Sequence, residues 1–225
     1  MKSSILCVTL IALFILTSCH QSAIKREKAT EIFNEGIAIN LESIEAQNKQ
    51  DWERASDLNK QSIAKFLEAY EIDSSYYVIF SALGHCYYID KQFDVAIPFF
   101  ERYLKIDDKS AVSIRELGLC KINKGKIEDG KSDIDKAFVL DTSQTIRTMT
   151  IQDLEGISDL AFEYGDAYRN EGEIQKGKDY KNFSVIVLAL AFEYNKNDDR
   201  IREKIIKLAK EIGNREMEEA YKKKI

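Results

Sequence analysis

A repeat of 34 residues most constrains what this chain can fold into. When the stretch from Tyr77 to Asp141 is shifted along itself by 34 residues, apolar and small residues fall on their equivalents. In the first half of the repeat the matching pairs are Phe80 with Ile114, Leu83 with Leu117, Gly84 with Gly118 and Cys86 with Cys120. Self-similarity at a fixed period of about 20 to 50 residues is typical of proteins built from stacked units.

The residue types within the repeat predict helices. In its second half, Phe93, Ala96, Phe100 and Ile106 match Ile127, Gly130, Ile134 and Leu140. Apolar residues three and four apart make one stripe per helix, and a helix pair that cannot bury its stripe alone stacks on the next pair. A mid-helix glycine such as Gly84 or Gly118 costs about 1 kcal/mol relative to alanine, which is tolerable where a neighbouring helix must approach closely. With one proline and ten glycines in 225 residues, the chain is predicted to be an all-α solenoid of helix–turn–helix repeats.

This pattern resembles the tetratricopeptide repeat (TPR). The family's positions are met by Phe80, Leu83, Gly84 and Tyr87 in a first helix and by Ala96 and Phe100 in a second. The sequence departs from the family at Tyr103, which is large for its slot, and at Asp108 and Thr142, where the family usually has proline. The resemblance implies a repeat domain over residues 27–225, strongest over 77–110, 111–144 and 158–191, and it implies a protein-binding surface.

The outer repeats are expected to be irregular. A helix is predicted over 29–47, with Asp51 as N-cap of the next, and the wide spacing from Gly36 to Phe66 predicts a first hairpin longer than its neighbours. About 13 extra residues fall near 142–156, and a long helix over 150–170 is expected to absorb many of them. The apolar run 185–192 is predicted to be a buried segment. A last, shortened repeat is expected over 198–212 and 215–224.

The amino terminus differs from the rest of the chain. Lys2 precedes an apolar run over 5–15 that is shorter than the roughly 20 residues of a spanning helix, which indicates a signal peptide over 1–18. The run ends in Leu-Thr-Ser-Cys, which resembles a bacterial lipobox and implies that Cys19 carries the lipid, followed by a tether over 19–26. The alternative is an ordinary secretory signal. We expect a cell-envelope lipoprotein on the periplasm-facing side of the outer membrane.

The sequence offers few chemical motifs. It has no nucleotide-binding loop, no paired metal-ligand spacing and only two histidines, so we expect no cofactor, no metal and no enzyme activity. The net charge of −5 is mildly acidic, so we expect no nucleic-acid binding surface. Cys86 and Cys120 occupy equivalent slots, either as buried thiols or as a disulfide. Equivalent helices pack about 8–10 Å apart, beyond disulfide reach, and this favours free thiols.

In the TPR family the first helix of each pair lines a concave groove. The corresponding slots are Ser81, His85 and Tyr88 in the second repeat, Arg115, Leu119 and Ile122 in the third, and Phe162, Asp166 and Arg169 in the fourth. We expect this groove to hold a peptide or protein partner of the envelope, with Leu119, Ile122 and Phe162 as an exposed apolar wall. The alternatives are a structural subunit that assembles through its edges and a carrier or enzyme for a small ligand.

Overall fold

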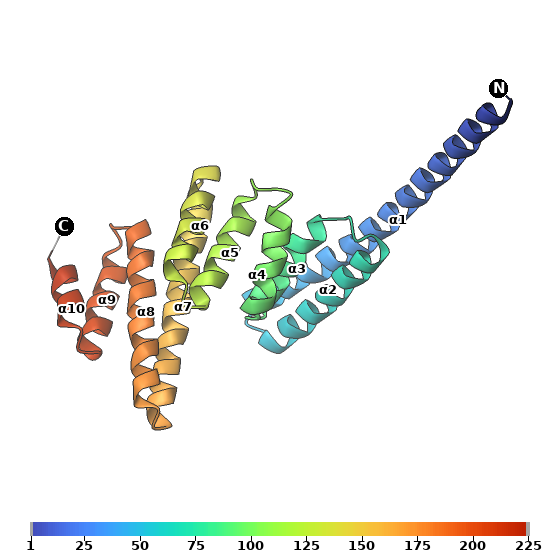
Figure 1. Ribbon diagram of the computed structural model, residues 1–225. Helices are drawn as coiled ribbons and strands as arrows, with labels where there is room; N and C mark the ends of the chain where they lie inside the picture. Colours follow the sequence, from blue (N-terminus) through green and yellow to red (C-terminus); the bar gives the residue numbers. More distant parts are fainter. Residues whose placement is uncertain (1, 224–225) are drawn as a thin grey trace. The chain divides into compact units, whose positions relative to one another are not determined.

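The computed structural model describes residues 2–223, and it describes side chains over 21–223. Within that range the chain is all-α, with ten helices packed in consecutive pairs (Figure 1). The predicted signal peptide over 1–18 and the predicted lipid site Cys19 lie outside the described side chains. Among the described residues, no helix combines the length and the apolar character that a membrane span needs.

The predicted repeat domain divides into two compact units, residues 1–108 and 109–225. The first unit contains helices α1 (Lys2–Asn48), α2 (Trp52–Ile72), α3 (Val78–Ile89) and α4 (Phe93–Leu104). The predicted tether over 19–26 is helical, because these residues belong to α1. As predicted, the first hairpin is long, since α2 has 21 residues against 12 in α4. Asp51 is the predicted N-cap of α2, and its side chain accepts a hydrogen bond from the backbone N–H of Arg54.

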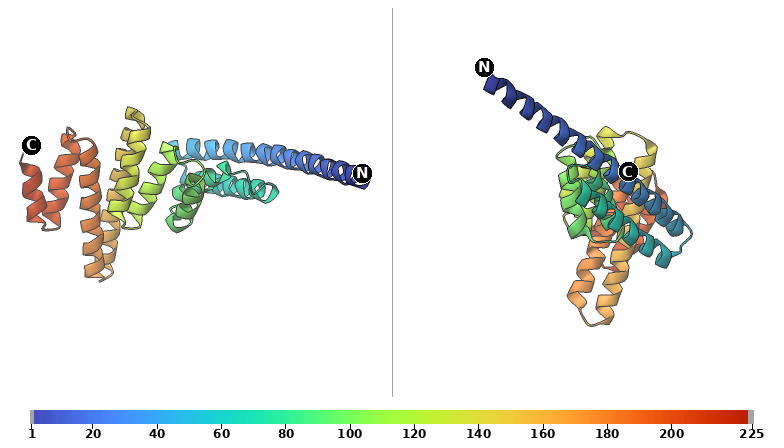
Figure 2. Two further views of the ribbon diagram at one scale, coloured as in Figure 1. Left: turned by 45° about the horizontal axis from the view of Figure 1, so that its top comes forward. Right: turned by 90° about the vertical axis from the view of Figure 1, so that its right-hand side faces the viewer.

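The second unit contains three helix pairs. Its helices are α5 (Ala111–Asn123), α6 (Ile127–Leu140), α7 (Gln144–Asn170), α8 (Ile174–Tyr194), α9 (Asp199–Glu211) and α10 (Arg215–Lys222). The extra residues of the fourth repeat lengthen its first helix, as predicted, although α7 begins at Gln144 rather than at Thr150. With 27 and 21 residues, α7 and α8 form the long hairpin of this unit (Figure 2). Asp198 caps α9, and Gly213 ends it at a φ of +75°.

Close helix crossings at glycine hold the pairs together. A Cβ added to Gly84 would lie 2.8 Å from the Phe100 ring, and one added to Gly118 would lie 2.7 Å from the carbonyl oxygen of Gly130. No side chain fits at such a separation without a shift of its neighbour, so the helix-propensity cost of glycine is offset by packing. The predicted reason for these glycines is therefore confirmed.

The cores of the units are apolar. Within α8, five residues of the predicted segment 185–192 are at most 5 % exposed, but Ile186 is 44 % exposed and departs from the prediction. Cys86 and Cys120 are buried free thiols, as predicted. Burial raises the pKa of the Cys120 thiol to about 12, because a thiolate loses its hydration there.

Candidate functional site

The predicted groove residues of the second repeat lie along α3. Ser81, His85 and Tyr88 are each partly buried. The Tyr88 ring packs against Phe93 at the start of α4, with 6.2 Å between the ring centres. These three positions retain some exposed surface.

The predicted groove residues of the third repeat do not form an exposed wall. Arg115, Leu119 and Ile122 are only 2 %, 0 % and 0 % exposed. The Nε of Arg115 donates to Thr150 Oγ1 at 2.9 Å, and its guanidinium also pairs with Asp153, so the lengthened first half of α7 lies against this face of α5. Ile122 packs beneath Gly130 of α6. The expectation that Leu119 and Ile122 face outward is wrong, because the chain's own helices cover that repeat.

In the fourth repeat, two predicted residues meet a lysine that the sequence analysis did not identify. The Lys181 Nζ lies 2.5 Å from Asp166 Oδ1, 3.0 Å from Glu211 Oε1 and 4.2 Å above the ring centre of Phe162. The Lys181 side chain is 3 % exposed, whereas both carboxylates are about half exposed. The ammonium is therefore desolvated but compensated by two charge-assisted contacts. Arg169 is exposed.

Lys181 occupies a slot that is apolar in the first three repeats. The glycines Gly36, Gly84 and Gly118 face Phe66, Phe100 and Ile134, and Gly165 faces Lys181 in the same way. The signal was present in the sequence, because the spacing of 47 residues that relates Gly118 to Gly165 also relates Ile134 to Lys181. A charge at a position that the repeat keeps apolar marks the fourth repeat as specialised.

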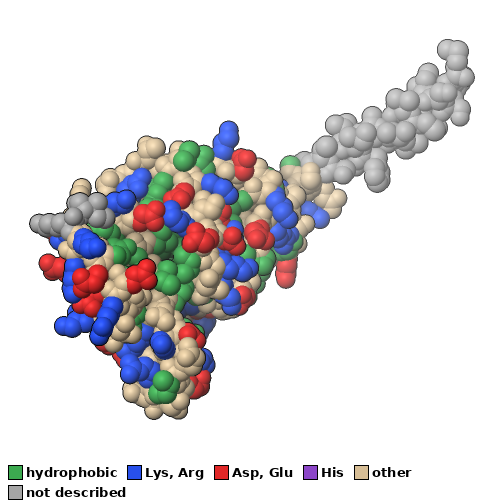
Figure 3. Space-filling model, turned by 60° about the vertical axis from the view of Figure 1, so that its left-hand side comes forward, with side chains coloured by type: hydrophobic (Ala, Val, Ile, Leu, Met, Phe, Trp, Pro, Cys, Tyr) green, Lys and Arg blue, Asp and Glu red, His purple; other side chains and the backbone are tan. Residues whose placement is uncertain are grey.

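A large hollow in the second unit lies on the second helices of the repeats, away from the predicted groove residues. It has a volume of about 870 Å³ and is bounded by α6, α8 and α10, with the first turn of α9 at one end. We call this hollow the second-helix groove. Figure 3 shows one face of the molecule, on which apolar side chains are interspersed with charged side chains of both signs.

The floor of the second-helix groove is a stripe along α8. Ile186, Ala189, Leu190 and Glu193 line it at spacings of three and four residues, with Ile127 of α6 and Tyr221 of α10 on either side. The sequence analysis did not identify this surface. The sequence does contain a signal for an exposed apolar surface on α8, because its apolar run covers all sides of the helix. Neighbouring helices bury only part of such a run, and the rest stays exposed.

The rim of the second-helix groove is charged and unevenly paired. Lys131 pairs with Glu193 at 3.1 Å, and Arg202 pairs with Asp199 at 2.8 Å. Lys196 and Lys223 also line the groove, and neither forms an ion pair with a described residue. The Nε of Arg202 is buried and has no hydrogen-bond acceptor within the described part of the chain.

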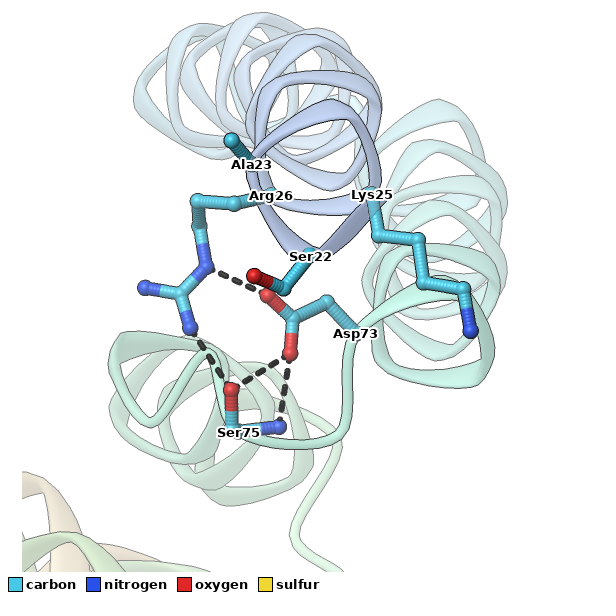
Figure 4. A pocket seen from close by; sticks show the side chains of 6 residues that line it. All are labelled: Ser22, Ala23, Lys25, Arg26, Asp73 and Ser75. Carbon is cyan, nitrogen blue, oxygen red and sulfur yellow. Dashed lines mark hydrogen bonds and ion pairs between the residues drawn. The ribbon is translucent and has the colours of Figure 1, made fainter. Parts of the chain in front are cut away.

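A smaller hollow of about 330 Å³ in the first unit is organised around an ion pair (Figure 4). Arg26 of α1 contacts the Asp73 carboxylate at 2.5 Å and donates to Ser75 Oγ at 2.8 Å. The hydroxyl and the backbone N–H of Ser75 donate to the other Asp73 oxygen. Hydrogen bonds from Arg26 and Ser75 to the charged form lower the pKa of Asp73 to about 2. This network ties the amino-terminal helix to the α2–α3 turn.

Comparison with known proteins gives similarity of fold only. No protein-family model matches the chain, and no curated protein sequence matches it. Among solved structures, a MamA crystal structure is 17% identical, with a TM-score of 0.41 over 81% of this chain and 91% of that one. PilF of Pseudomonas aeruginosa is 16% identical, with a TM-score of 0.40 over 87% and 90% of the two chains. Yeast Tom70 is 13% identical, with a TM-score of 0.36 over 80% and 44%.

The helix pairs, their glycine crossings and their repeated apolar slots define the fold. It is a TPR-like helical repeat. The described residues contain no group of three or more His, Cys, Asp or Glu side chains arranged to hold a metal ion.

Proposed function

We propose that the protein is a lipid-anchored interaction scaffold of the bacterial cell envelope. In this proposal Cys19 carries the lipid, the chain lies on the periplasm-facing side of the outer membrane, and the second unit binds a protein partner without catalysis. The second-helix groove carries the proposal, because it combines a hollow of about 870 Å³ with an apolar floor and a charged rim. Partly exposed apolar floors with polar rims are typical of protein-binding surfaces.

The anchor is supported by the sequence. Leu-Thr-Ser directly before Cys19 provides the small residues that lipoprotein processing needs, and the apolar run before them has the length of a signal segment. Metabolic labelling with an alkynyl fatty acid tests it in a bacterial host. We expect label on the wild-type chain and none on Cys19→Ala, with Cys7→Ala as the matched control that keeps the label. Labelling that persists in Cys19→Ala would contradict the anchor.

The binding surface is tested by photo-crosslinking in cells. A photoreactive residue at position 186, in the groove, is compared with one at Ile174, which is on the same helix, is 61 % exposed and lies outside the groove. We expect a discrete adduct with one envelope protein from position 186 and none from position 174. The purified full chain should then bind that protein. Adducts of equal yield from both positions, or none from position 186, would contradict a binding role for the groove.

A further inference from the structure

The shape of the second-helix groove indicates the kind of segment it receives. Its floor residues Ile186, Ala189, Leu190 and Glu193 follow the spacing with which one helix packs against another. Ala189 on the floor and Ala220 on the α10 wall have short side chains, which leave room for a partner helix. The stripe from position 186 to the end of α8 at Tyr194 is about 12 Å long, which equals about two turns of a partner helix. An extended strand has no sheet edge to pair with here, because every described element is a helix.

The charge at one end of the groove indicates the polarity of that segment. The carboxyl end of α8, the amino end of α9 and the carboxyl end of α10 lie at the same end of these three helices (Figure 1). They bring Lys196, Arg202 and Lys223 to one end of the groove, with Asp199 and, in the last turn of α8, Glu193 as acidic lining residues. Asp199 is already paired with Arg202, and Glu193 is paired with Lys131. This end therefore has positive charge in excess, although the whole chain is negative at −5.

Arg202 contributes to the positive charge at this end but not to the surface that meets a ligand. Its side chain is 18 % exposed, and its Nε is buried without an acceptor among the described residues. The ammonium groups of Lys196 and Lys223 are on exposed side chains that line the groove. A carboxylate of a partner satisfies these groups with charge-assisted hydrogen bonds.

We propose that the second-helix groove binds an amphipathic helix of a partner protein that has an apolar stripe and acidic residues at one end. The apolar stripe packs on Ile186, Ala189 and Leu190, and the acidic end lies against Lys196 and Lys223. This inference rests on the proposed function and specifies the chemistry of its partner. The contacts are those of a helix laid in a groove, with charge that sets its direction and increases its association rate.

Selection from a displayed library tests this chemistry. A phage-displayed library of helical segments of about 16 residues, randomised on the apolar and charged faces, is selected on the full chain purified in detergent. We expect the selected helices to carry an apolar i, i+3, i+4, i+7 stripe and a cluster of Asp or Glu at one end. Their affinity should fall about 10-fold or more with Ile186→Glu and change by less than about 2-fold with Ile174→Glu.

Charge reversal is the decisive variant. The double substitution Lys196→Glu with Lys223→Glu lies at the exposed rim and leaves the floor intact. It should weaken acidic helices about 10-fold at low salt, less at high salt, and should select helices with Lys or Arg instead. Selected helices that are basic on the wild-type chain, that keep their affinity for Ile186→Glu, or that do not emerge at all overturn the inference. The crosslinking from position 186 tests the proposed function separately. An adduct from position 186 without selection of acidic helices would indicate that the groove binds a partner of different chemistry, whereas no adduct would contradict the binding role itself.

Discussion

Gly118 and Gly130 face each other where α5 crosses α6. A Cβ built on Gly118 would lie 2.7 Å from the carbonyl oxygen of Gly130, and a Cβ on Gly130 would collide with the carbonyl oxygen of Gly118. Gly165 and Gly177 repeat the relationship between α7 and α8, where a Cβ on Gly177 would lie 2.5 Å from the Gly165 oxygen. The atom that an added Cβ would meet is a backbone carbonyl oxygen, which cannot rotate away as a side chain can. A side chain at either position must therefore push the two helices apart.

Gly118→Ala should destabilise the second unit. Alanine gains about 1 kcal/mol of helix propensity, but overpacking against the α6 backbone costs more, so the free energy of unfolding should fall by about 1–3 kcal/mol. Gly156→Ala in α7 is the matched control, because a Cβ there meets no described neighbour within 4 Å, and it should stabilise by up to about 1 kcal/mol. Urea unfolding followed by circular dichroism measures both. Equal effects of the two substitutions would show that the crossing is loose.

Replacing Lys181 should separate packing from charge. Lys181→Met keeps an unbranched chain against Gly165 and leaves Asp166 and Glu211 in contact with water, so the free energy of unfolding should change by less than about 1 kcal/mol. Lys181→Ala opens a cavity in the slot and should cost about 2–4 kcal/mol. Thermal unfolding of the two variants separates the contribution of packing from that of the ion pairs. If the methionine variant loses as much as the alanine variant, the two ion pairs, and not the packing, stabilise this repeat.

The Arg26–Asp73 pair predicts a loss of stability in acid. The folded pKa of Asp73 is lowered from 3.8 to about 2, so its contribution is fully present above pH 4 and is lost as the pH falls towards 2. Because the Arg26 side chain is 42 % exposed, water weakens the pair and the contribution should be about 1 kcal/mol. Denaturant midpoints between pH 2 and 5 measure it. Asp73→Asn should flatten this part of the curve, whereas Asp57→Asn on the exposed face of α2 should leave its shape unchanged; identical curves for wild type and Asp73→Asn would exclude the contribution.

The two thiols in the repeats should resist alkylation while the chain is folded. Cys86 and Cys120 are buried, and the pKa of Cys120 is raised to about 12, so very little thiolate forms at pH 8. Iodoacetamide labelling read by peptide mass spectrometry should modify each only after addition of denaturant. Rapid labelling of either thiol in the native chain, or recovery of a peptide pair joined by a disulfide, would contradict this burial.

The fold could be predicted from the repeat, because each unit places glycines and apolar residues at the same positions of its two helices. Gly84 and Gly118 indicated close crossings, and the long spacing from Gly36 to Phe66 indicated a longer first hairpin; both follow from local spacing alone. The division into two units at residue 108 was not predictable, because it depends on how many contacts join successive pairs.

The candidate site was less predictable, since it depends on which faces the neighbouring helices cover. Arg115 occupies a groove position by register, yet the extra turns of α7 cover it through Thr150 and Asp153. Ile186 belongs to a run that reads as buried core, and only the arrangement of α6, α8 and α10 leaves it exposed. Lys181 is recoverable from the register, since it lies 47 residues after Ile134, but its ion pairs with Asp166 and Glu211 depend on the tertiary packing.

The central claim is that the second-helix groove, rather than the first-helix face, binds the partner. The most direct measurement is the affinity of the full chain for the protein that copurifies with it from detergent-solubilised envelopes, compared between Ile186→Glu in the groove and Arg169→Glu on exposed α7. We predict that Ile186→Glu weakens binding about 10-fold or more and that Arg169→Glu changes it by less than about 2-fold. A loss with Arg169→Glu and full binding by Ile186→Glu would contradict the claim.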